Sequence, residues 1–165
     1  MTYSYLSMLL TGVLLLTTGC TNTSEQEHDP VTVQQDKVPI LATLNNETKA
    51  AFSRDYDLWT TYWVHRDDIT KTYINFADST HSESVGWDNI SGFVRNFIAA
   101  HPEPEPAPQL LDSVDIRLYG DGAWVSYEQL DSLRGRKRET RLMEKVMGQW
   151  KIAGMHTTIY GDSSY

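Results

Sequence analysis

The sequence predicts an α+β fold in which helices pack on one face of an antiparallel sheet. Two stretches with a helical apolar period precede a region in which apolar and polar residues alternate, as they do in half-buried strands. The clearest region is residues 118–160, where period-two patterns meet at two tight turns. These observations indicate a β-meander that closes a domain with helices in its first half.

An apolar run at residues 8–16 is too short to span a bilayer and is typical of a signal-peptide core. Thr18, Gly19 and Cys20 follow it and resemble the box of bacterial lipoproteins, in which the cysteine thiol receives diacylglycerol. The resemblance implies that residues 1–19 are a signal peptide. Lipidated Cys20 would then anchor the chain to the lipid bilayer of the bacterial cell envelope, on the periplasmic or outer-membrane face. The alternative is a secreted protein, and because Cys20 is the only cysteine, no internal disulfide can form.

Residues 20–42 are expected to be a flexible tether, because they are polar, include Pro30 and Pro39, and show no apolar period. The net charge of −8 argues against a nucleic-acid partner. A short basic cluster at residues 134–138 is expected to be a solvated turn. The alternative role for this cluster is contact with anionic lipid headgroups or with a cell-surface polymer.

Two helices and a strand are predicted next. The first helix covers residues 47–66, because aromatic residues recur at i, i+4, i+7 and i+11, namely at Phe52, Tyr56, Trp59 and Trp63. A strand follows at residues 71–76, which are rich in aromatic and β-branched residues. The second helix begins near residue 87 and stops at the proline-rich residues 101–108. Its apolar residues have ideal helical spacing and are Ile90, Phe93, Val94, Phe97 and Ile98.

The meander contains two hairpins, one turning at residues 120–122 and the other at Met147 and Gly148. A tight second turn places Glu139 and Arg141 on one sheet face, because side chains alternate along a strand. The next strand would contribute to that face Trp150, Ile152, Gly154 and His156. A bulge would instead present Thr140, Leu142 and Glu144. We predict the tight turn, and with it a core in which Met143, Ile152 and Trp150 lie under the helices and Phe93 is buried.

Residues 139–152, followed by His156, resemble the closing hairpin of the nuclear-transport-factor-2-like superfamily, in its SnoaL-like and ketosteroid-isomerase-like branch. The resemblance implies one domain at residues 43–161. It also implies a cone-shaped, curved antiparallel sheet packed against two to three N-terminal helices, a cystatin-like α+β roll with one pocket. Because this fold hosts isomerases, dehydratases, cyclases and binding modules, the resemblance alone does not identify a reaction.

The residues expected to line the pocket are Trp63, His65, Tyr73, Trp87, Tyr127, Glu139, Arg141 and His156. His156 is the best single candidate, and its alternative is a hydrogen-bonded histidine at a sheet edge. Arg141 either binds a carboxylate or pairs with a neighbouring glutamate. His65 lies beside Asp67 and Asp68, which serve either as acid and base groups or as ordinary loop residues.

The histidines are scattered without the spacing of metal ligands, and no nucleophile motif or nucleotide loop occurs, so no metal or cofactor is expected. We expect an envelope-anchored accessory protein of the SnoaL-like type that binds a small molecule with an apolar body and a carbonyl or carboxylate end. One alternative is a cofactor-independent isomerase or lyase that uses His156 with a carboxylate. Another is an interaction module that forms homodimers through the exposed sheet face.

Overall fold

The computed structural model describes residues 30–131 and 135–161. The expected signal peptide, Cys20 and the first part of the expected tether lie outside these residues, as does part of the basic cluster. No helix in the described part of the chain is long and apolar enough to cross a membrane.

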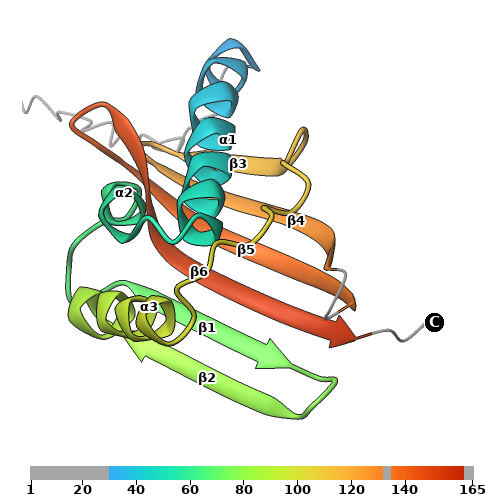
Figure 1. The fold of residues 1–165 in the computed structure, drawn as a ribbon. Helices are drawn as coiled ribbons and strands as arrows, with labels where there is room; N and C mark the ends of the chain where they lie inside the picture. The colour runs from blue at the N-terminus through green and yellow to red at the C-terminus, as the bar shows by residue number, and fades with distance from the viewer. Residues whose placement is uncertain (1–29, 132–134, 162–165) are drawn as a thin grey trace, which may run out of the picture.

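The predicted α+β fold is confirmed. A curved sheet of six strands carries the helices on one of its faces (Figure 1). The described helices are α1 (Pro30–Phe52), α2 (Tyr56–Thr61) and α3 (Trp87–Ala100). The strands are β1 (Thr70–Asn75), β2 (Thr80–Val85), β3 (Asp115–Tyr119), β4 (Gly122–Asp131), β5 (Gly135–Val146) and β6 (Gln149–Gly161). Their order in the sheet is β2-β1-β6-β5-β4-β3, and among these six described strands β1 and β6 are the one parallel pair.

Helix α1 corrects the tether prediction, because it begins at Pro30 and includes Pro39. Ile40 and Leu44 are fully buried, one helical turn apart, so α1 packs on the sheet and is not a free linker. The sequence pattern missed this because Pro39 is unfavourable inside a helix and the apolar residues of α1 do not recur with a clear helical period.

The single predicted helix at residues 47–66 is divided into α1 and α2. Arg54 has a φ of 63°, in the left-handed region, and this ends the first helical path. Asp55 then caps α2, since its carboxylate accepts a hydrogen bond of 2.9 Å from the Leu58 amide. The division brings Trp59 and Trp63 back toward α1.

The predicted helix from Trp87 is confirmed as α3. Strand β2 was not predicted, because its residues are polar and exposed.

The predicted tight turn is confirmed, because Val146 pairs with Gln149 across Met147 and Gly148. Both turn residues have positive φ, 49° and 78°, as a two-residue hairpin of type I′ requires.

A β-bulge lies further along the same hairpin. Met143 pairs with Ile152, but Leu142 pairs with Gly154, so Ala153 is the extra residue. Beyond the bulge, Arg141 pairs with Met155, and Glu139 pairs with Thr157.

The bulge makes the prediction for His156 wrong. His156 lies opposite Thr140, is exposed, and faces away from the helices. The predictions for Met143, Ile152 and Trp150 are confirmed, since all three are buried on the helix side. The prediction that Phe93 is buried is wrong, because 47% of this residue is exposed. Its ring, on α3, lines a cavity above the sheet.

Candidate functional site

A cavity of about 370 Å³ lies between α1, α3 and the inner face of β1, β5 and β6. The wall from α3 is mostly apolar and consists of Phe93, Val94, Phe97 and Ile98. The wall from the sheet is mostly polar and charged. A cavity with this division holds a ligand that has one apolar and one polar end.

The strand register arranges the polar wall in two neighbouring rows. In the first row, Lys71 of β1 pairs with Met155 of β6, which pairs with Arg141 of β5. The second row consists of Tyr73, Thr157, Glu139 and Tyr127, in strand order β1, β6, β5 and β4. Because side chains two residues apart point to the same face of a strand, both rows face the cavity side.

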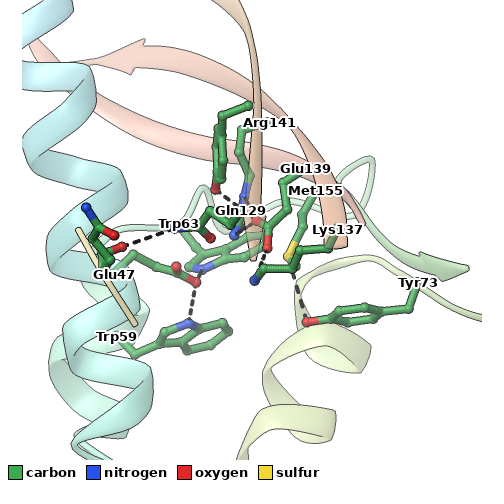
Figure 2. Close-up of polar contacts among 11 residues, drawn as sticks. Glu47, Trp59, Trp63, Tyr73, Gln129, Lys137, Glu139, Arg141 and Met155 are labelled. Atoms are coloured by element: carbon green, nitrogen blue, oxygen red, sulfur yellow. Dashed lines mark hydrogen bonds and ion pairs between the residues drawn. The ribbon is translucent and has the colours of Figure 1, made fainter. Parts of the chain in front are cut away.

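Glu139 is the centre of a buried ion network (Figure 2). Its Oε2 atom accepts hydrogen bonds from Arg141 Nη2 at 2.6 Å, Arg141 Nε at 3.1 Å and the Tyr127 hydroxyl at 2.8 Å. Its Oε1 atom accepts a hydrogen bond from Lys137 Nζ at 2.7 Å. Alternation along β5 creates this network, since Lys137, Glu139 and Arg141 occupy every second position.

Burial raises the pKa of Glu139, but the nearby Arg141 and Lys137 cations outweigh burial and lower this pKa to about 2. Burial also raises the pKa of Tyr127, and the adjacent Glu139 carboxylate acts in the same direction. Burial lowers the pKa of Arg141, but the nearby Tyr127 and Glu139 hold it above its ordinary value. At neutral pH, therefore, Glu139 is an anion, Arg141 a cation and Tyr127 a neutral phenol.

A second buried carboxylate enters the cavity from α1. Glu47 Oε1 accepts hydrogen bonds from the indole nitrogens of Trp59, at 2.8 Å, and Trp63, at 3.1 Å (Figure 2). Both indoles belong to the stretch that follows the break at Arg54. Glu47 therefore fixes α2 and the segment after it against α1, with its carboxylate on the cavity lining.

Two residues of the cavity lining each have a buried polar atom without a hydrogen-bond partner among the described residues. These atoms are Arg141 Nη1 and Thr157 Oγ1. Lys71, also buried, makes no hydrogen bond or ion pair within that part of the chain. Its ammonium group lies 5.4–5.8 Å from three ring centroids, those of Trp59, Tyr73 and Phe93. Buried donors without partners are rare in proteins, so this wall has an unused capacity for hydrogen bonding.

The charges of the cavity lining do not cancel. The cations Lys71, Lys137 and Arg141 face the anions Glu47 and Glu139, which leaves one positive charge. Arg54 and Glu105 also belong to the lining, but they neutralise each other in an ion pair of 2.8 Å. The cavity therefore has a surplus of one positive charge in a largely buried environment.

A model of the SnoaL-like domain matches residues 40–160, most of the chain. The chain belongs to the SnoaL-like domain family. No curated protein matches this SnoaL-like chain in sequence.

Solved structures show the same fold. An NTF-2-like protein of unknown function from Shewanella oneidensis is 17% identical, with a TM-score of 0.55, over 74% of this chain and 98% of that chain. A cystatin-like fold protein from Burkholderia xenovorans is 18% identical, with a TM-score of 0.58, over 81% of this chain and 95% of that chain. An NTF2-like protein with a cystatin-like fold from Novosphingobium aromaticivorans is 15% identical, with a TM-score of 0.56, over 81% of this chain and 88% of that chain. These similarities confirm the predicted cystatin-like fold, and the match of the SnoaL-like domain model to residues 40–160 supports the predicted superfamily.

The SnoaL-like domain brings together part of the predicted pocket. Tyr73, Glu139 and Arg141 line the cavity, and the Tyr127 hydroxyl donates a hydrogen bond to Glu139. Trp63 is buried behind Glu47.

The remaining predicted residues lie elsewhere. His65 is exposed, its ring stacks on Trp87 with 3.8 Å between centroids, and its Nε2 lies 2.9 Å from the Thr60 carbonyl oxygen. His156 is on the outer face of the sheet, where its Nε2 lies 3.4 Å from Thr158 Oγ1. The described residues include no group of three or more His, Cys, Asp or Glu side chains that could hold a metal ion.

The sequence prediction missed the cavity residues Glu47, Lys71, Lys137 and Thr157. Lys71 and Lys137 could have been found, because each lies two residues from a predicted pocket residue on the same strand and so shares its face. Glu47 had no such signal, since a glutamate in a polar stretch is typical of a solvated helix surface.

Proposed function

We propose that this SnoaL-like domain binds a small organic monoanion, with an apolar or aromatic body, in the cavity between α3 and the sheet. The observation that carries the proposal is the buried Nη1 of Arg141, which has no partner among the described residues and belongs to the cavity lining. A guanidinium group with a free N–H in a dry site binds a carboxylate strongly, because the hydrogen bond is charge-assisted.

The net charge of +1 on the cavity lining supports a ligand of charge −1. One carboxylate would neutralise the single excess positive charge of the lining, whereas a neutral ligand would leave a buried cation without compensation. Lys71 lies in the same row as Arg141, separated from it by Met155, so both cations can face one anionic group. The apolar body would then contact Phe93, Phe97 and the other side chains of α3.

The test compares 3-phenylpropanoate with its neutral amide in thermal unfolding and calorimetry. The acid should raise the unfolding temperature, because a ligand that binds only the folded state stabilises it by about 1.4 kcal/mol for each tenfold excess over Kd. The amide should have no effect at the same concentrations. Equal binding of the amide and the acid would contradict the proposal.

A pair of variants locates the site. Lys71→Met keeps the length of the side chain but removes its charge, and it should weaken binding of the acid at least tenfold. Arg138→Met is the matched control, since Arg138 is exposed on the outer face of β5. If Arg138→Met weakens binding as much as Lys71→Met, the anion binds to the surface and not in the cavity.

Binding is favoured over the isomerase or lyase reaction considered from the sequence. That reaction needed His156 beside a carboxylate, and His156 lies on the opposite face of the sheet from the cavity. Glu139, with a pKa of about 2, is a weak proton acceptor at neutral pH because its cationic partners stabilise the ionised form.

We also propose that lipidated Cys20 anchors the chain in the bacterial cell envelope. The support is in the sequence, where the apolar run of residues 8–16 is followed by Thr18, Gly19 and Cys20. Cys20→Ser should release the protein from the membrane fraction and abolish labelling with fatty acid. Membrane association that is unchanged in Cys20→Ser would contradict the anchor.

Homodimerisation through the outer sheet face is a second candidate role. Trp124, Leu142 and Val85 lie in one cross-strand row on that face and are between 44% and 49% exposed. Trp124 and Leu142 are adjacent in this row, and adjoining exposed apolar side chains are typical of a contact surface between proteins. Sedimentation should give the mass of two chains for the wild type and of one chain for Leu142→Glu. A wild-type protein that sediments as one chain at high concentration would exclude this role.

A further inference from the structure

We propose that the ligand of the cavity is a hydroxy or oxo monocarboxylate, in which a neutral oxygen lies within a few carbon atoms of the carboxylate. This inference rests on the proposed function and specifies the chemical class of the ligand. The inference comes from two hydroxyl groups of the protein that would gain no hydrogen-bond partner if the ligand carried only a carboxylate.

The first hydroxyl group belongs to Thr157, which is 2% exposed. Thr157 lines the cavity, and its Oγ1 atom is buried without a hydrogen-bond partner in the described part of the chain. A buried hydroxyl group normally finds a partner, so an unpartnered one in the wall of a cavity indicates a ligand atom that can hydrogen-bond to it.

The second hydroxyl group belongs to Tyr73. Within the described ranges, its one polar contact is with the Met155 Sδ atom, at 4.0 Å (Figure 2). A thioether sulfur is a weak acceptor, so the Tyr73 O–H group is available to a better one. Tyr73 also lines the cavity.

The two hydroxyl groups occupy one place in the sheet. Tyr73 and Thr157 are directly paired across β1 and β6. The row of Lys71, Met155 and Arg141 is two residues away along the strands, a distance of about 6.6 Å. A ligand whose carboxylate meets the cations therefore reaches the hydroxyl pair only with an atom close to that carboxylate.

The ligand atom that meets the two hydroxyl groups must be neutral, and this follows from the net charge of the cavity lining. A single carboxylate already neutralises the surplus of one positive charge, so a second anionic group would be buried without compensation. Tyrosine and threonine hydroxyl groups are themselves neutral, and a threonine hydroxyl both donates and accepts. A carbonyl or hydroxyl oxygen on the ligand satisfies both, and a dicarboxylate does not.

The test uses three acids with the same phenyl body: 3-phenylpropanoate, 3-phenyllactate and benzylmalonate. Calorimetry should show 3-phenyllactate binding at least tenfold more tightly than 3-phenylpropanoate, and benzylmalonate binding more weakly than 3-phenyllactate. Tyr73→Phe and Thr157→Val should each remove most of the advantage of 3-phenyllactate over 3-phenylpropanoate, measured as the ratio of the two dissociation constants in the same variant. Thr158→Val, on the outer face of the same strand, is the control and should change neither affinity.

The outcomes separate the two proposals. If 3-phenylpropanoate binds and 3-phenyllactate binds no more tightly, the chemical class proposed here is wrong and the anion site stands. The same conclusion follows if benzylmalonate binds most tightly. If none of the three acids binds to the wild-type protein, the anion site itself is wrong and this inference fails with it.

Discussion

Arg141 and Glu139, two residues apart on β5, form an ion pair with 2.6 Å between Nη2 and Oε2 while both side chains are about 95% buried. Removing two charges from water is costly, and their mutual attraction in the protein interior offsets that cost only with good geometry and additional hydrogen bonds. Here the extra bonds come from Tyr127 and Lys137. The complete network therefore compensates both buried charges, and removal of either charged residue should lower the stability of the fold.

Replacing Glu139 with alanine should reduce the free energy of unfolding by about 3–5 kcal/mol, because Arg141 would remain buried without its anion. Urea denaturation at pH 7 measures this loss. Glu128→Ala on the exposed face of β4 is the control and should cost less than about 0.5 kcal/mol. A loss below about 1 kcal/mol in Glu139→Ala would mean that water already reaches the network.

The stability of the domain should fall in acid because of Glu139. Its pKa is about 2 in the folded protein against an ordinary value of 4.5. A carboxyl group whose pKa is lower in the folded than in the unfolded protein adds to the free energy of unfolding at pH values above its unfolded-state pKa. This addition is lost as the pH falls toward and through the folded-state pKa. The contribution should be about 3 kcal/mol at pH 7, and more than half of it should be lost between about pH 5 and pH 3.

This acid dependence is measured by chemical unfolding at a series of pH values. Glu139→Gln provides the reference, since glutamine does not titrate and its stability should decline less steeply over the same range. Parallel curves for the wild type and Glu139→Gln would show that other carboxyl groups cause the acid sensitivity.

Thr157→Val should stabilise the free protein by about 1 kcal/mol, although it changes a residue of the proposed site. The reason is that valine has nearly the same shape and removes a buried hydroxyl group that lacks a partner. Thermal unfolding without ligand measures the change. A loss of stability in Thr157→Val would show that the hydroxyl group is satisfied by bound water in the free protein.

Met147→Asn should also stabilise the domain, by about 0.5–1 kcal/mol. Met147 is 98% exposed and has a φ of 49°, a conformation that costs a methionine more than an asparagine. Urea denaturation compares the variant with the wild type, and Gln149→Asn beside the turn is the control. If both variants change stability equally, the effect does not come from the turn conformation.

The register of the β5–β6 hairpin shows how far the sequence could predict this site. The turn at Met147 and Gly148 was predictable because alternation on both sides points to it. The bulge at Ala153 was not, because Ala153 and Gly154 have side chains too small to indicate a face. His156 was therefore predicted to lie in the cavity. Its neighbour Thr157, which does line the cavity, was not predicted.

The burial of Glu47 and Lys71 illustrates a second limit. Strand alternation places Lys71 on the same face as Tyr73, but local sequence does not show that either charged residue is buried, because partners distant in sequence surround them. Glu47 meets indoles 12 and 16 residues away, and Lys71 lies among rings from α2, β1 and α3. Charged pocket residues of this kind follow from the tertiary structure, whereas the apolar period of α3 is a property of the helix alone.

The position of β6 in the sheet has a consequence for the order of folding. β6 lies between β1 and β5, and no other strand among the described residues joins the β1–β2 hairpin to the β3–β5 meander. It also comes later in the sequence than both of these units. During synthesis on the ribosome, the two parts of the sheet can each form local hairpins but cannot join into one sheet until residues 149–161 have emerged. The parallel β1–β6 pairing joins residues some 80 positions apart in the chain, so its closure should be a slow step of folding.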